Sequence, residues 1–119
     1  MYKIIFYEDA HGNSDVLEYL ETLEKEAATN KQSRIKRNKI VAYMDMLEKM
    51  GTRVGEPVTK HLTGEIWELR PLKNRILYAY YEDDKFIVLH HFVKKTQKTP
   101  KREIEKAIRN LSDYRERNK

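Results

Sequence analysis

The stretch IWELRPLKNRILYAYYEDDKFIVLHHF, residues 66–92, decides the fold. It contains three runs rich in aromatic and β-branched residues, which favour strands. Pro71–Asn74 separates the first two runs, and Asp83-Asp84 separates the second from the third. Short polar turns of this kind join neighbouring antiparallel strands, so the stretch predicts a three-stranded meander. The predicted strands cover residues 66–70, 75–82 and 85–92.

One strand and two helices are predicted before this meander. Tyr2–Tyr7 is β-branched and aromatic, as expected of a strand. Apolar residues at helical spacing then indicate helices over Ser14–Glu26 and Gln32–Met50. Ser14 belongs to a turn and N-cap segment, and Gly51 is a favoured residue just past a helix end. The segment Lys60–Gly64, just ahead of the meander, is interpreted as a turn.

A last helix is predicted after the meander. Thr99 is a good N-cap residue, and Pro100 suits the first helical position. The helix positions expected to face the core include Ile35, Val41, Ile104, Ile108 and Leu111. The resulting order, β-α-α-β-β-β-α, predicts an α+β fold. Its small antiparallel sheet would carry two N-terminal helices and one C-terminal helix, in a single domain over residues 1–119.

Charge is distributed unevenly along the 119 residues, whose net charge is +5. Residues 1–59 hold nine Lys and Arg against ten Asp and Glu, whereas residues 60–119 hold fifteen against nine. A basic half favours an anionic partner over a purely solubilising role. The chain has no cysteine and no apolar run long enough for a signal peptide or a membrane span. We therefore expect a cytoplasmic protein.

The familiar signatures of cofactor and metal sites are missing from the sequence. It has no Gly-rich phosphate loop and no HExxH metal helix. His90 and His91 are adjacent, so strand alternation would point them to opposite faces and not to one ion. The three serines do not support a Ser-His-Asp site. We therefore expect neither a metal nor a cofactor.

The cations around the predicted sheet are more informative. Arg70 ends one strand and Arg75 opens the next, and three lysines, Lys94, Lys95 and Lys98, leave the end of the last strand. Arginine forks and lysine ammonium groups bind phosphate oxygens, so this convergence predicts an anion site. His91 could move a proton near neutral pH, or it could be structural. Phe92 and Tyr78 could stack a base, although Tyr78 lies in an apolar run typical of the core.

Three motifs in this order give the sequence a familiar pattern. They are WELR at 67–70, RILY at 75–78 and HxFxKKTxKTP at 90–100. The sequence resembles the HigB branch of the RelE-like toxins, including the phage-derived toxin-like proteins, over nearly the whole chain. The resemblance implies a RelE-like fold. It further implies a type II toxin, an mRNA interferase that cleaves mRNA on the translating ribosome and so inhibits translation.

The resemblance also implies partners and residue roles. A helix-turn-helix antitoxin of the HigA type would inhibit the toxin in a hetero-oligomer. Arg70 and Arg75 would bind phosphate and stabilise transition-state charge. Lys94 or Lys95 would support the 2′-oxygen or the leaving group, with His91 as the alternative proton carrier. The residues left for contacts with RNA are Lys73, Tyr78, Phe92 and Lys98.

Two questions stay open at this level. Alternation places His91 and Lys95 on one face of the last strand and Phe92 and Lys94 on the other, unless a bulge intervenes, so the substrate-facing lysine is undecided. The activity also has alternatives: a non-catalytic toxin of the same superfamily, for example one that targets gyrase, or a simple nucleic-acid-binding module. The binding module would show salt-sensitive binding without cleavage.

Overall fold

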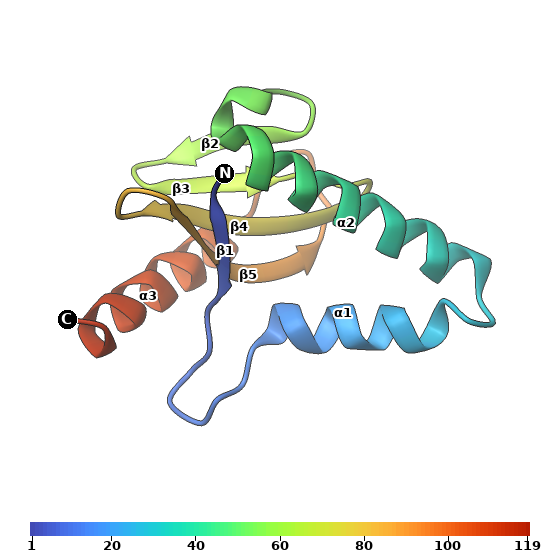
Figure 1. Cartoon of the computed structure of the whole chain (residues 1–119), viewed down its shortest axis with the longest axis horizontal. Helices are drawn as coiled ribbons and strands as arrows, with labels where there is room; N and C mark the ends of the chain where they lie inside the picture. Colours follow the sequence, from blue (N-terminus) through green and yellow to red (C-terminus); the bar gives the residue numbers. More distant parts are fainter.

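The computed structural model describes residues 1–119, with three α-helices and one five-stranded sheet (Figure 1). None of its helices is both long and apolar enough to cross a membrane. The elements, in chain order, are β1 (Lys3–Phe6), α1 (Asp15–Glu26), α2 (Lys31–Met50), the short 3₁₀ helix η1 (Gly51–Val54), β2 (Thr59–Thr63), β3 (Ile66–Leu69), β4 (Asn74–Tyr81), β5 (Lys85–Val93) and α3 (Lys101–Arg117).

The sheet has the strand order β1-β5-β4-β3-β2. The predicted meander is confirmed, because β3, β4 and β5 pair antiparallel in sequence order. Two predictions were wrong. The sheet is mixed and not antiparallel throughout, since β1 pairs parallel with β5. The segment expected as a turn forms β2, an edge strand of sequence TKHLT that pairs with β3. Its polar, largely exposed residues gave no apolar run to signal a strand.

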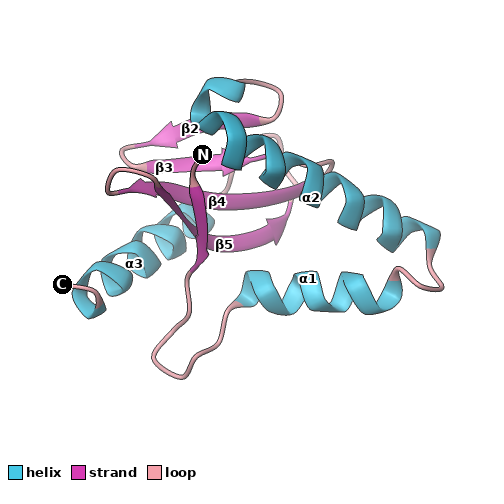
Figure 2. Ribbon diagram, viewed as in Figure 1, coloured by secondary structure: helices cyan, strands magenta, loops and turns pink.

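The helices cover opposite faces of the sheet, α1 and α2 on one and α3 on the other (Figure 2). Strand alternation supplies both cores, as β4 illustrates. Ile76 and Tyr78 pack with the α1 and α2 residues Val16, Ile40 and Leu47, whereas Leu77 and Ala79 pack with Ala107 and Leu111 of α3. The sheet is therefore the middle layer of three.

A β-bulge in β5 decides which way its last residues face. Leu77 pairs with His90 but Tyr78 pairs with Val88, so Leu89 is the extra residue. Leu89 and His90 consequently share the α3 face, and His91, opposite Ile76, lies on the α1 face. The bulge precedes His90, so the alternation from His90 to Val93 is regular and sets Phe92 on the same face as His90.

Local chemistry explains the helix ends. The Ser14 hydroxyl accepts a hydrogen bond from the Leu17 amide, as an N-cap does. Gly51 ends α2 with φ of 65°, and a Cβ there would lie 2.8 Å from the Tyr2 ring. Only glycine meets both requirements. The predicted cap of α3 was wrong: Pro100 is the N-cap and forms no side-chain hydrogen bond, while the Thr99 hydroxyl bonds elsewhere.

Three apolar helix residues expected in the core lie at the surface. Ile35, Val41 and Ile108 are 42%, 58% and 47% exposed. Each helix contacts the sheet through one narrow stripe of side chains. In α2 this stripe contains Ile40, Tyr43 and Leu47. A residue next to that stripe, such as Val41, is rotated by about 100° and misses the sheet. Leu111 is buried as predicted.

Candidate functional site

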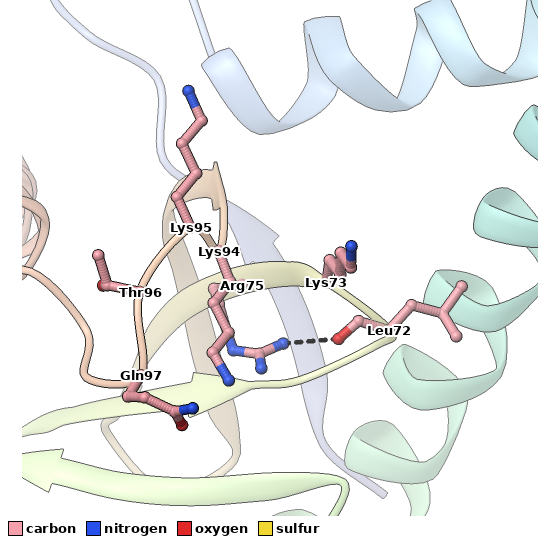
Figure 3. A pocket seen from close by; sticks show the side chains of 7 residues that line it. All are labelled: Leu72, Lys73, Arg75, Lys94, Lys95, Thr96 and Gln97. Carbon is pink, nitrogen blue, oxygen red and sulfur yellow. Dashed lines mark hydrogen bonds between the residues drawn. The ribbon is translucent and has the colours of Figure 1, made fainter.

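An open pocket of about 730 Å³ lies where β4 begins and β5 ends (Figure 3). Figure 1 shows α3 leading away from this end of the sheet. Three parts of the chain meet there: the β3–β4 turn, the start of β4 and the loop after β5. The lining residues are Leu72, Lys73, Arg75, Lys94, Lys95, Thr96 and Gln97. Four of these seven are cationic and none is acidic, so the pocket favours an anion.

Arg75 is a buried, hydrogen-bonded side chain of the pocket. It is only 6% exposed, because it pairs with Phe92 inside the sheet. Its Nη1 donates to the carbonyls of Leu72 and Asn74, each at 2.8 Å. Both hydrogen bonds leave from Nη1, so Nη2 remains for a ligand. Burial lowers the pKa of Arg75, which the Glu68 carboxylate opposes; an arginine keeps its charge at neutral pH.

A buried carboxylate lies beside Arg75. Glu68 is 2% exposed, and its Oε1 lies 3.7 Å from Arg75 Nε and 3.5 Å from Arg70 Nε. The convergence expected of Arg70 and Arg75 is therefore observed, and an acid mediates it. Thr99 donates its hydroxyl hydrogen to the other oxygen, Oε2. Sequence reasoning assigned Glu68 no role, although an acid inside the apolar run IWEL was a usable signal.

The lysines after β5 differ in where their side chains lie relative to the pocket. The Lys94 amide donates to the Lys73 carbonyl at 2.7 Å, which extends the strand pairing by one residue. Lys94 follows Phe92 by two positions and so shares the face of Arg75. Lys95 lines the rim, and Figure 3 shows its side chain extending away from the Arg75 guanidinium. Lys98 is exposed and does not line the pocket.

Comparison with known families gives a match over most of the chain. Residues 18–112 match the family described as Phage derived protein Gp49-like (DUF891). The chain belongs to this family. It is a toxin-like family of the RelE and HigB type, associated with the toxins of toxin–antitoxin systems, and it implies an antitoxin partner. Curated proteins yield no match.

In this Gp49-like protein, His91 does not join the cationic pocket. Its ring stacks on Tyr19 of α1 with centroids 3.9 Å apart, and its Nε2 donates to Asn74 Oδ1 at 3.0 Å. Burial lowers the pKa of His91 to about 4, so the ring is neutral at physiological pH. The structure thus corrects the placement of His91 as a proton carrier beside Arg75. Its face of β5 is the one that packs on α1.

The two aromatic residues expected to stack on RNA bases, Tyr78 and Phe92, lie in different surroundings in this Gp49-like protein. Tyr78 is fully buried, and its hydroxyl lies 2.6 Å from Thr59 Oγ1. Burial raises the pKa of Tyr78 to about 12, against the effect of the Thr59 hydrogen bond. No base can stack on Tyr78 while the core is closed, which corrects that expectation. Phe92 is half-buried and packs against the core on the α3 side; it pairs with Arg75 but does not line the pocket.

His90 has a structural role that the sequence did not indicate. Its Nδ1 lies 2.8 Å from Asp15 Oδ2 and its Nε2 lies 2.7 Å from Glu103 Oε1. Ionised carboxylates only accept hydrogen bonds, so both ring nitrogens donate and the ring is an imidazolium. Burial lowers the pKa of His90, but the hydrogen bonds to both carboxylates outweigh burial and raise it. His90 thereby joins the first turns of α1 and α3.

Proposed function

We propose that this Gp49-like protein is a RelE-like, HigB-type toxin that cleaves mRNA on the translating ribosome, with residues 1–119 as one toxin domain. The observation that carries the proposal is the buried Arg75 guanidinium, held by two backbone carbonyls at a pocket whose other charged residues are all lysines. Such a group binds a phosphate without reorganising, which is how electrostatic stabilisation accelerates phosphoryl transfer.

The proposed reaction needs only groups of the RNA, cations from the protein and water. The ribose 2′-hydroxyl gives its proton to water and its oxygen attacks the adjacent phosphorus. The bond from phosphorus to the 5′-oxygen of the next nucleotide breaks, and that oxygen takes up a proton from water. The products are a 2′,3′-cyclic phosphate and a 5′-hydroxyl end. Arg75 and Arg70 would neutralise the charge that develops on the non-bridging oxygens.

Lys94 is the lysine we assign to the reacting atoms. It shares the face of Arg75, whereas Lys95 extends away. Its ammonium would stabilise the 2′-oxygen or the departing 5′-oxygen. Phe92 would stack a neighbouring base, and the more exposed Lys73, Lys95 and Lys98 would contact the RNA backbone. A HigA-like antitoxin with a helix-turn-helix domain is the proposed inhibitor.

Cleavage by the purified protein tests this proposal. A defined mRNA would be incubated with the protein, with and without translating ribosomes, and the new ends would be mapped. We expect cleavage only with ribosomes, leaving cyclic phosphate ends. Cleavage of naked RNA would remove the ribosome requirement but keep the nuclease. Absence of cleavage in both formats by a folded protein would overturn the proposal in favour of a binding or gyrase-targeting toxin.

The lysine assignment has a matched pair of variants. Lys94→Ala and Lys95→Ala remove the same charge from neighbouring positions of one loop. We expect Lys94→Ala to slow single-turnover cleavage at saturating ribosomes by about 100-fold, the usual size of a lost electrostatic group. Lys95→Ala should weaken binding and leave the saturated rate nearly unchanged. The reverse ranking would move the assignment to Lys95.

A further inference from the structure

Glu68 is an acid placed where the proposed function has no obvious use for one. It lies on β3 beside Arg75 of the cationic pocket, and its side chain is only 3% exposed. A buried carboxylate is retained only with partners that compensate its desolvation. Glu68 has three partners, which come from three different parts of the site: Arg70, Arg75 and Thr99.

The contacts of Glu68 are directional. Oε1 approaches the Nε atoms of both Arg70 and Arg75, at 3.5 and 3.7 Å. Nε lies on the inner edge of a guanidinium, so an acid held there turns the outer Nη groups away from itself. Oε2 accepts the hydrogen bond from Thr99, in the loop that also carries the pocket lysines. One carboxylate thus forms ion pairs with both arginines and a hydrogen bond with the lysine loop.

Burial excludes a direct role for Glu68 with substrate. A general base must come within hydrogen-bond reach of the proton it removes, and this side chain is closed off from solvent by its own partners. Arg70 supplies a second observation. Its Nε is a buried nitrogen without a hydrogen-bond partner, because Glu68 lies close but is poorly aligned. A small shift of Arg70 toward a bound anion would improve that alignment.

We propose that Glu68 is a positioning residue that aligns Arg70 and Arg75 as a two-guanidinium clamp for one RNA phosphate group. The inference rests on the proposed function for its RNA substrate, but it concerns a different residue and property. Glu68 would orient the donors and tie the lysine loop to the sheet through Thr99. Misplacement of such donors by about 1 Å is enough to cost about 100-fold in rate.

The sign of the charge makes this proposal testable. Glu68 is negative and lies beside an anion site, so replacing it by a neutral residue strengthens anion binding if only charge matters. A positioning role instead predicts that RNA affinity and cleavage rate change in different ways. The variant Glu68→Gln keeps the volume and should bind RNA as tightly as the wild type or more tightly, yet cleave it more slowly. A purely structural role would lower both together.

Glu56 provides the matched control. Its carboxylate also approaches Arg70, Nη1 to Oε1 at 3.5 Å, but it is 66% exposed. Glu68→Gln and Glu56→Gln would be compared in single-turnover cleavage on saturating ribosomes and in binding of an RNA with a 2′-deoxy scissile nucleotide. We expect Glu68→Gln to cleave about 10- to 100-fold more slowly without loss of affinity. Glu56→Gln should match the wild type in both.

A second readout does not depend on cleavage. Nitrogen-15 NMR would follow the Nε–H signals of Arg70 and Arg75 in the free protein and during titration with inorganic phosphate. In the wild type we expect slow exchange with water for Arg75 Nε–H and phosphate-induced shifts for both arginines. In Glu68→Gln, exchange of the Arg75 Nε–H with water should be fast. Should Glu68→Gln fail to fold by circular dichroism, Thr99→Val, which removes only the donor to Oε2, should show the same difference between affinity and cleavage rate more weakly.

The outcomes of these experiments distinguish failure of the nuclease proposal from failure of the positioning role of Glu68. Wild-type protein that cleaves no RNA, but shows the Arg signals changed by Glu68→Gln, would refute the nuclease and keep the positioning role. Glu68→Gln with wild-type cleavage or unchanged Nε–H exchange would overturn the positioning role and leave the nuclease intact. Parallel loss of affinity and rate would also overturn it.

Discussion

Two adjacent residues of the same type, His90 and His91, have pKa shifts of opposite direction in this protein. His90 lies between the carboxylates of Asp15 and Glu103, which raise its pKa despite burial. His91 stacks on Tyr19 and contacts no carboxylate, so burial lowers its pKa to about 4. The surroundings of each ring therefore determine the direction in which its pKa is shifted.

The raised pKa of His90 predicts a loss of stability at high pH. The folded state holds the proton more tightly than the unfolded chain, so the stabilisation is complete below the ordinary histidine pKa near 6.5. It is lost as pH rises through the higher folded pKa. Urea unfolding at a series of pH values would measure this. Glu103→Gln should flatten the dependence, whereas an equally steep curve in that variant would refute the assignment.

The lowered pKa of His91 predicts the opposite trend in acid. The unfolded chain binds a proton near pH 6.5 while the folded ring stays neutral down to about pH 4. Stability should therefore fall as pH decreases through this window, by roughly 3 kcal/mol at most and less where water reaches the ring. Proton NMR of the ring would show the His91 midpoint near 4. A midpoint above 6.5 would contradict the packing described for Tyr19.

At the scale of the elements, the sequence predicted those with strong apolar signals and missed those without. β3, β4, β5 and all three helices were predicted because their buried residues recur with strand or helix periodicity. β2 was missed because an edge strand buries little, and its residues TKHLT are mostly polar. The parallel pairing of β1 could not be predicted, because long-range partners leave no local signal.

The two apolar residues of α3 at positions 108 and 111 give an element-scale prediction. Leu111 is 4% exposed and Ile108 is 47% exposed. Leu111→Ala should lower the free energy of unfolding by roughly 2–5 kcal/mol, because it opens a cavity in the core. Ile108→Ala should cost well under 1 kcal/mol, as surface changes do. Chemical denaturation of both variants would check this, and equal costs would contradict the packing of α3.

At the scale of the whole molecule, the sequence indicated the cationic pocket but not its internal organisation. The basic second half and the cations flanking β4 and β5 were visible as a pattern. Glu68 was not, because nothing local reveals that one acid reaches two arginines and a threonine. The proposed choice of Lys94 over Lys95 rests on the register of β4 on β5, which only the folded sheet supplies.

The concentration of charge predicts salt-dependent RNA binding. Each lysine that contacts a phosphate contributes about 0.7 to the slope of log affinity against log salt for single-stranded RNA. Lys94→Ala should reduce the slope by about that amount. Lys119→Ala, at the exposed C-terminus, should leave it unchanged. Binding isotherms of a non-cleavable RNA at several salt concentrations would measure both, and equal slopes would place Lys94 away from the RNA.

The decisive measurement is single-turnover mRNA cleavage on translating ribosomes by Arg75→Ala, with Arg109→Ala on the exposed side of α3 as the charge-matched control. Arg75→Lys, which keeps the charge and loses the fork, would accompany them, and circular dichroism would confirm folding. We expect Arg75→Ala to lower the cleavage rate by about 100-fold or more, Arg75→Lys to restore little, and Arg109→Ala to match the wild type. A folded Arg75→Ala protein that cleaves mRNA at the wild-type rate would contradict the assignment of this pocket as the site of RNA cleavage.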